Sequence, residues 1–104
     1  MPFDGTEGSP IALDTAGQWT RQYQEQHKGE VRAYFAGRKI LEQLLAQPDC
    51  MGIRIYYGLN GSIPSLVLVG ADREENDQLG NGFIVADELS SCPPCCAQPN
   101  VLNS

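Results

Sequence analysis

The sequence lacks a long apolar run and has little positive charge. Its apolar stretches are far shorter than the roughly 20 residues that a membrane-spanning helix needs. Lys and Arg number 7 against 13 Asp and Glu, and the net charge of -6 repels phosphate backbones and anionic lipid surfaces. We therefore expect neither nucleic acid nor membrane as a partner.

A secretory signal is also missing. The N-terminal residues MPFDGTEGSP have neither the basic nor the apolar region of a signal peptide, so we expect a soluble, cytoplasmic protein. In a reducing cytosol the 4 cysteines are expected as free thiols or metal ligands and not as a disulfide framework.

Patterns of catalytic and cation-binding sites are absent too. His27 is the single histidine and has no sequence neighbour that would orient it toward a nucleophile, and neither G-x-S-x-G nor H-E-x-x-H occurs. The acidic stretch DREENDQLGNG fails as a calcium loop, because Asp77 stands where glycine is needed and Phe83 where a bidentate glutamate belongs. The sequence therefore names no catalytic or cofactor-binding residue and favours a non-enzymatic protein. It predicts a solvated loop for this stretch.

What is present fits one small folded unit. The chain has 104 residues, 41% of them hydrophobic, which is enough for a single core. Residues 1–13 are rich in glycine and proline without periodicity, and 92–104 are rich in cysteine and proline. We expect a loose leader over 1–13, one domain over 14–91 and a C-terminal tail over 92–104.

Two helices are expected in the first half. Thr15 and Gln18 match a capping box, and Gly29 is a fitting stop. An apolar stripe at helical spacing comprises Ala16, Trp19, Tyr23 and His27. We expect the stripe to pack in the core and its histidine to end the helix. A short extended segment at 31–35 and a second helix at 38–47 follow, although one continuous helix is an alternative.

The strongest local signal is a β-hairpin. GIRIYYGL and PSLVLVGAD flank Asn60-Gly61, a pair typical of a type I′ turn. The first strand alternates, with apolar side chains on one face, whereas the second is apolar on both faces and is predicted to be central in its sheet or to lie at an oligomer interface. With a third strand at 83–86, these elements predict an α+β fold with two helices on one face of a small, mainly antiparallel sheet.

The stretch CPPCC leaves three alternatives open. Three thiolates with Cys50 or His27 would supply four zinc ligands, which makes Cys50, Cys92, Cys95 and Cys96 the candidate metal residues. A disulfide that involves Cys50 or Cys96 is the second alternative, and free thiols are the third. A thioredoxin-type use of Cys92 and Cys95 is disfavoured, because no long helix can follow and the prolines favour an extended chain.

In order along the chain, LAQPDCMGIRIYYGLNG, SLVLVGAD and CPPCC resemble the landmarks of a group of small bacterial proteins that end near a Cys-Pro-Pro-x-Cys motif. The similarity covers about the last two-thirds of the chain, which extends eight residues beyond the motif. It implies a special role for Cys50, Cys92 and Cys96, and it implies no activity, because none is assigned to the group.

Two hypotheses follow. The first is a non-enzymatic module that binds a protein partner or itself through the doubly apolar strand or an open sheet edge. The alternative is a metal- or thiol-dependent protein whose cysteine-rich tail forms a zinc site or a redox switch.

Overall fold

The computed structural model describes residues 2–103, which form two compact units. The larger unit contains residues 2–7 and 36–89, and the smaller contains 8–35 and 90–103. The smaller unit therefore joins an early and a late segment of the chain, which pair through residues 33–35 and 90–92. Each unit is described by itself.

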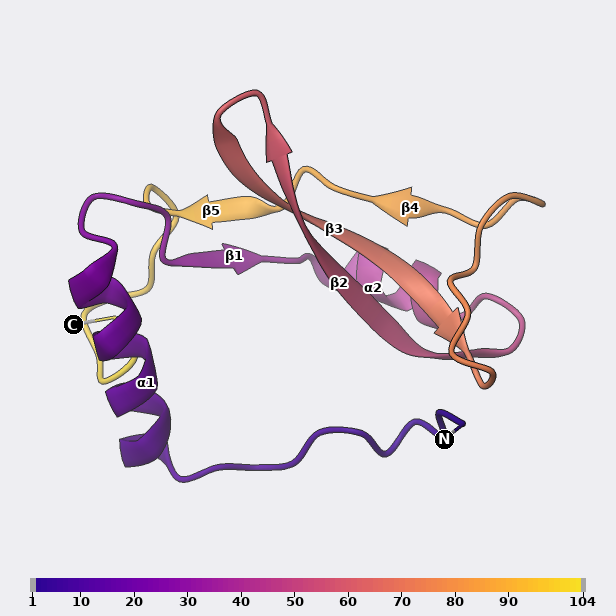
Figure 1. The fold of residues 1–104 in the computed structure, drawn as a ribbon, viewed down its shortest axis with the longest axis horizontal. Coiled ribbons are helices and arrows are strands. Elements are labelled where there is room, and N and C mark those ends of the chain that lie inside the picture. The colour runs from indigo at the N-terminus through magenta and orange to yellow at the C-terminus, as the bar shows by residue number, and fades with distance from the viewer. Residues whose placement is uncertain (1, 104) are drawn as a thin grey trace. The chain divides into compact units, whose positions relative to one another are not determined.

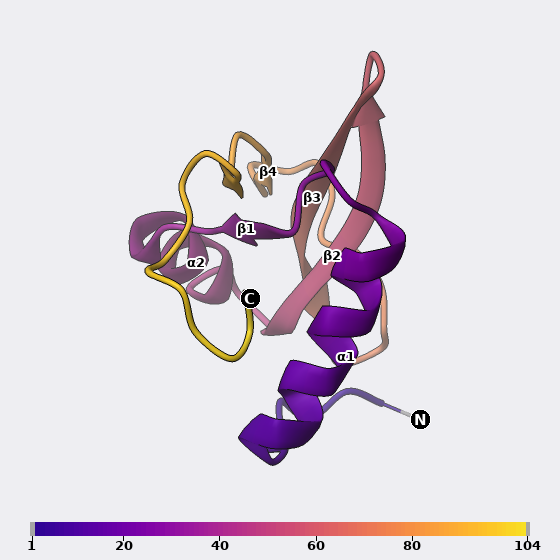
Figure 2. The ribbon, with the colours of Figure 1, turned by 90° about the vertical axis from the view of Figure 1, so that its left-hand side faces the viewer.

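The larger unit is built on the predicted hairpin. It contains α2 (Arg38–Leu45), β2 (Cys50–Asn60), β3 (Ile63–Asp72) and β4 (Val85–Ala86). The three strands form an antiparallel sheet in the order β2-β3-β4, so the expected third strand is confirmed, although it is shorter than predicted. Helix α2 packs against β2 and β3 at the end of the hairpin away from its turn (Figures 1 and 2).

The hairpin turn lies one residue later than expected. Asn60 pairs with Ile63, so the central turn residues are Gly61 and Ser62 and not Asn60 and Gly61. Gly61 has a φ of 66°, and Ser62 is not among the residues with positive φ. A positive φ at the first central residue alone is the pattern of a type II′ turn, which requires glycine there. The predicted type I′ turn is therefore wrong.

Strand β3 is the central strand, as its doubly apolar sequence predicted. Leu68 and Val69 point to opposite faces, and each is only 2% exposed. Leu68 belongs to the core cluster with Leu44 of α2 and Ala86 of β4, and Ile53 of β2 packs against it. The buried apolar side chains of β3 are thus used within the unit.

A polar bridge that the sequence did not predict joins the segment after α2 to the loop after β3. The Gln78 side chain is 5% exposed, and its Nε2 donates to the Pro48 carbonyl at 2.6 Å. Its Oε1 accepts from Gln47 Nε2 at 3.1 Å. Gly70 of β3 leaves room for both amides, because a Cβ there would lie 2.5 Å from Gln78 Oε1. The loop is therefore partly buried and not simply solvated.

The smaller unit contains α1 (Leu13–Gln26), β1 (Ala33–Phe35) and β5 (Ser90–Cys92). Strands β1 and β5 pair antiparallel, which confirms the predicted extended segment and places the start of the expected tail in a sheet. The predicted capping box is wrong, because α1 begins earlier, at the N-cap Ala12, with no side-chain cap. His27 does end the helix as its C-cap.

The predicted apolar stripe of α1 is not a core. Trp19 is 62% exposed and Tyr23 is also exposed, and the buried residue of the helix is Gly17. A Cβ at Gly17 would overlap Cγ1 of Val101, so the C-terminal segment 97–103 packs closely on the helix there. Gln24 Nε2 also donates to the Leu102 carbonyl at 2.8 Å.

Two helices and two small antiparallel sheets confirm the α+β class. The strands are divided between two sheets, with α2 in the unit of the three-stranded sheet and α1 in the unit of the two-stranded sheet. Within residues 2–103, neither helix combines the length and the apolar composition that crossing a bilayer requires.

Candidate functional site

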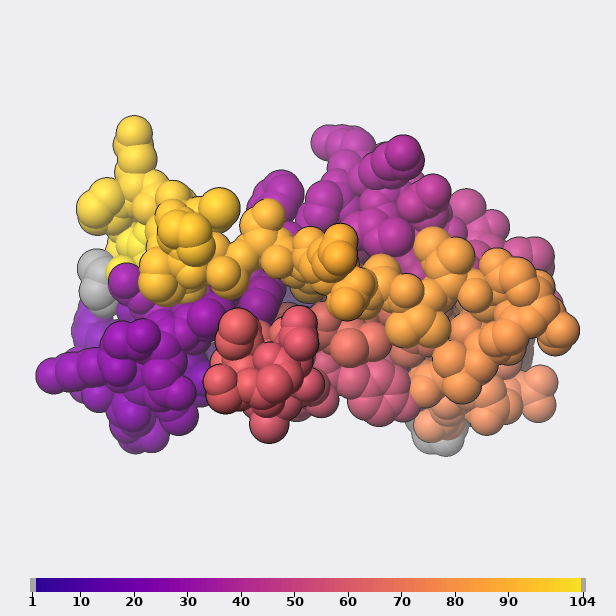
Figure 3. Space-filling model, turned by 90° about the horizontal axis from the view of Figure 1, so that it is seen from above, coloured from indigo at the N-terminus to yellow at the C-terminus, as the bar shows by residue number. Residues whose placement is uncertain are grey.

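The turn end of the hairpin is the most exposed apolar part of the larger unit. We call residues 55–67 the hairpin arm. On one face of β2, Tyr57 is 94% exposed, Leu59 74% and Ile55 56%. The arm extends away from α2 and beyond the end of β4 in Figure 1, and its turn residues form part of the surface shown in Figure 3. The predicted apolar face of the first strand therefore contributes Ile53 to the core and leaves the rest in solvent.

The strand edges of the arm are open within the described chain. β4 pairs only with Leu68 and Val69, so the arm is a two-stranded ribbon between its turn and that point. β2 is an edge strand of its sheet, and among residues 2–103 its ladder partner is β3 alone. An isolated two-stranded hairpin is marginally stable in water, and an open edge offers a row of unpaired N–H and C=O groups to another chain.

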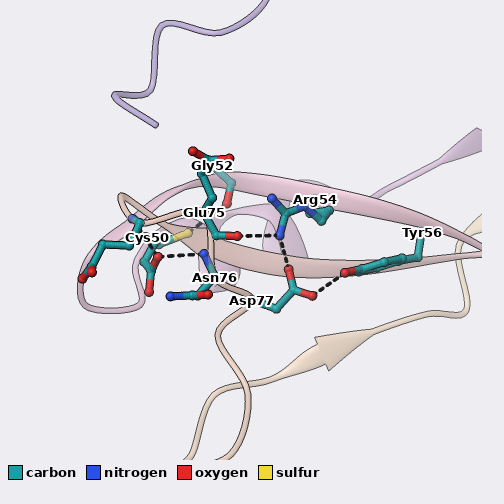
Figure 4. A network of polar contacts seen from close by, with 9 residues as sticks. Cys50, Gly52, Arg54, Tyr56, Glu75, Asn76 and Asp77 are labelled. Atoms are coloured by element: carbon teal, nitrogen blue, oxygen red, sulfur yellow. Dashed lines mark hydrogen bonds and ion pairs between the residues drawn. The ribbon is translucent and has the colours of Figure 1, made fainter. Parts of the chain in front are cut away.

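A network of side chains from β2 and the loop after β3 holds the base of the arm (Figure 4). Arg54 Nη1 donates to Asp77 Oδ1 at 2.5 Å and to the Glu75 carbonyl at 3.1 Å. The Tyr56 hydroxyl donates to the other Asp77 oxygen at 2.5 Å. In the same loop, Asp72 Oδ1 accepts the backbone N–H groups of Glu74 and Asn76.

The charges of this network reinforce one another. The hydrogen bond from Tyr56, followed by the ion pair with Arg54, holds the pKa of Asp77 below its ordinary value. The Asp77 carboxylate in turn raises the pKa of both Tyr56 and Arg54. Such a fixed ion pair is typical of a structural anchor, since each charge is already satisfied within the protein.

The N-terminal segment lies beside the first residues of β2. Gly5 lies close to the Met51 carbonyl, with 3.4 Å between that oxygen and the position of a Cβ on Gly5. The Phe3 ring lies below the Arg54 guanidinium, 5.4 Å from ring centre to carbon. A hollow of about 250 Å³ remains between the segment and the strand. The N-terminal segment does not cover the part of β2 that follows Arg54.

The cysteine loop lies in the smaller unit and contains a disulfide. Cys92 at the end of β5 is joined to Cys96, with 4.8 Å between their Cα atoms. The Cys92–Pro93 and Pro93–Pro94 peptide bonds are cis. Cys95 is an exposed free thiol, and Cys50 is a half-buried free thiol in the larger unit with its Sγ 3.1 Å from the Gly52 carbonyl. Of the three alternatives, the structure thus contains the disulfide that involves Cys96.

The predicted zinc site is not assembled. Across residues 2–103, no three His, Cys, Asp or Glu side chains are grouped so that they could hold a metal ion. Cys92 and Cys96 form a disulfide, so neither offers a thiolate to a metal ion. Cys50 belongs to the other unit. His27, the alternative ligand, donates from Nδ1 to Glu30 Oε2 at 2.9 Å and stacks on Tyr23. Zinc binding stays a prediction for the reduced chain.

A second hollow, of about 530 Å³, borders the cysteine loop at Pro93. All three basic residues of the smaller unit line it, namely Arg21, Lys28 and Arg32, together with His27. Glu25 and Glu30 also line it, so the hollow carries a small positive excess in a chain of net charge -6.

Sequence reasoning missed two features of these sites. The β3 edge of the arm is open because β4 has only 2 residues and pairs only with Leu68 and Val69. The alternation of β2 had placed Arg54 and Tyr56 together on one face. The anchoring role of Asp77 was not predicted, because it depends on the strand register that brings the loop back to Arg54. The sequence left the disulfide as one of three alternatives for the CPPCC stretch and did not single out the pair Cys92 and Cys96.

The fold and sites define a small α+β protein with an open hairpin and a disulfide loop. Comparison with protein-family models, curated proteins and solved structures found no match to this chain.

Proposed function

We propose that the protein is a self-associating module in which the hairpin arms of two copies pair through β2. The observation that supports this proposal is the open edge of β2 next to Tyr57, whose side chain is 94% exposed. Apolar side chains on a ribbon of two strands are normally covered by a further strand or layer. A second copy would supply both the strand and the apolar face.

Charge favours a second copy over a different protein as the occupant. Residues 55–67 contain no Asp, Glu, Lys or Arg, although the chain as a whole carries a net charge of -6. Two arms can therefore approach without like charges facing each other. A basic partner, by contrast, would be attracted to the acidic residues of the chain, and these lie outside the arm.

The geometry of β2 favours one register. In a symmetric antiparallel pair centred on Tyr57, residues 54–60 of the two copies would face each other. Ile55 would then oppose Leu59 of the second copy, so that the two apolar faces merge. A register centred on Ile55 would extend the pairing to Cys50, where the N-terminal segment already lies beside the strand at Met51.

The test is the molecular mass in solution across protein concentration, by sedimentation equilibrium. We expect a concentration-dependent dimer, and Tyr57→Lys should raise its dissociation constant about tenfold or more, because about 1.4 kcal/mol is lost when two facing aromatic side chains become two facing ammonium groups. Leu79→Lys is the matched control, since it adds the same charge at an exposed apolar residue outside the arm. Weak dimers form at concentrations of about 100 μM. A wild-type protein that stays monomeric up to this concentration would refute the proposal.

The second candidate function is the thiol-dependent one, and the free Cys95 beside the Cys92–Cys96 disulfide favours it. We keep the cytoplasmic location as part of the proposal. Cytosolic disulfides are usually transient, catalytic or redox-sensing, so this location would make the bond a reactive one and not a permanent staple.

A further inference from the structure

Three cysteines lie within five residues of the chain at the end of β5. The disulfide joins Cys92, which is 6% exposed, to the exposed Cys96. The free thiol of Cys95 is exposed and belongs to the residue next to Cys96. A disulfide with a neighbouring free thiol is the arrangement that thiol–disulfide exchange requires.

Backbone hydrogen bonds fold the loop back on the end of β5, next to Cys92. Cys95 N donates to the Ser91 carbonyl at 2.9 Å, which turns the chain back on the end of β5. Arg32 N donates to the Cys92 carbonyl at 2.6 Å, which ties Cys92 to the β1 side of the sheet. Cys92 is therefore the fixed residue of the loop, and the next two cysteines lie where the chain returns to it.

We propose that Cys92 exchanges its disulfide partner between Cys96 and Cys95, so that the loop is a thiol–disulfide exchange site. The Cys95 thiolate attacks Cys92 Sγ, the bond from Cys92 to Cys96 breaks, and Cys96 leaves as a thiolate that takes up a proton. The proton lost by Cys95 balances the proton gained by Cys96. The step moves no net electrons and needs no external oxidant or reductant.

Each isomer presents one exposed thiol, which can also react with a small external disulfide. The thiolate attacks one sulfur of R–S–S–R, a mixed disulfide forms, and R–S⁻ leaves. The basic residues of the smaller unit line the hollow beside Pro93. Their positive charge favours disulfides that carry carboxylates. Oxidised glutathione is a suitable probe of that class.

The first experiment counts thiols in denatured single variants after air equilibration. Cys96→Ser should form the bond from Cys92 to Cys95 and leave Cys50 as its one reactive thiol. Cys95→Ser should keep the bond from Cys92 to Cys96, and Cys92→Ser should leave three reactive thiols. If Cys96→Ser instead leaves Cys92 and Cys95 both reduced, the exchange is impossible and the proposal fails.

The second experiment uses the native wild-type protein. Iodoacetamide at about pH 8.5, near the ordinary pKa of a thiol, should label Cys95 in some molecules and Cys96 in others, as located by fragment-ion mass spectrometry. Label confined to Cys95 at all times would overturn the exchange. Oxidised glutathione should add one glutathionyl group to the wild type and react at least tenfold more slowly with Cys95→Ser. Equal rates would place the adduct on Cys50 and overturn the assignment of the reactive thiol.

Discussion

Replacing Gly70 by alanine tests whether the polar bridge holds the larger unit together. The added Cβ would lie 2.5 Å from Gln78 Oε1 and 2.9 Å from Gln47 Nε2, so both amides must move. Their mutual hydrogen bond and the bond from Gln78 to the Pro48 carbonyl would be lost or lengthened. An unpaired buried polar group costs about 1–3 kcal/mol.

Against that cost stands a small gain, because alanine is favoured over glycine within a strand by roughly 0.5–1 kcal/mol. Gly58→Ala has the same gain without the cost, so we expect Gly70→Ala to have a free energy of unfolding about 1–3 kcal/mol lower than Gly58→Ala, measured by urea denaturation followed by far-UV circular dichroism. Gly58→Ala is the matched control on the same hairpin, because its Cβ would meet the nearest atom, the Ser65 carbonyl oxygen, at an ordinary 3.5 Å. Gly70→Ala as stable as Gly58→Ala would refute the reasoning.

Two further predictions concern the anchor of the arm and the C-terminal segment. The pKa of Asp77 is lowered in the folded state, so its contribution to stability is present above its unfolded pKa of about 3.9 and is lost as the pH falls through the folded value. Asp77→Asn should thus be less stable than the wild type at pH 7 and match it in strong acid; a difference that persists unchanged in acid would contradict this. Gly17→Ala should strengthen α1 by helix propensity yet displace Val101, giving faster amide hydrogen exchange over 97–103. Unchanged exchange in that segment would rule out the close contact.

The hairpin was predictable because local pattern and turn chemistry agree there. The same two strands are indicated by three features: the alternation in β2, the apolar residues on both faces of β3 and the glycine between them. The turn moved by one residue because Gly61 can serve in either of two overlapping turns, and the cross-strand register decides between them. Local sequence alone does not determine that register.

The stripe of α1 shows where periodicity is insufficient. Trp19 and Tyr23 recur at helical spacing, but spacing does not say whether another element covers that face, and in the structure both are exposed. Gly17, which had drawn no attention, is the contact that matters because its lack of a side chain admits Val101. Long-range contacts of this kind leave no local signal.

The candidate sites were predictable in part. The resemblance singled out Cys50, Cys92 and Cys96 without saying which of them pair, and the residues alone left metal, disulfide and free thiols open; the structure joins Cys92 to Cys96. Of the two interpretations of the doubly apolar strand, the structure confirms the central strand, because Leu68 and Val69 are buried on opposite faces of β3. The open edge belongs to β2.

The most direct measurement of the proposed pairing is a cross-link at its symmetry axis. In a Cys50→Ser, Cys95→Ser background, Tyr57→Cys would place two thiols on opposed residues about 4.5–5.5 Å apart at Cα, within disulfide range, whereas Leu59→Cys would separate its two thiols by about 13 Å. The account predicts a covalent dimer of Tyr57→Cys on a non-reducing gel and a monomer of Leu59→Cys. A monomer in both variants, or equal cross-linking of both, would contradict it.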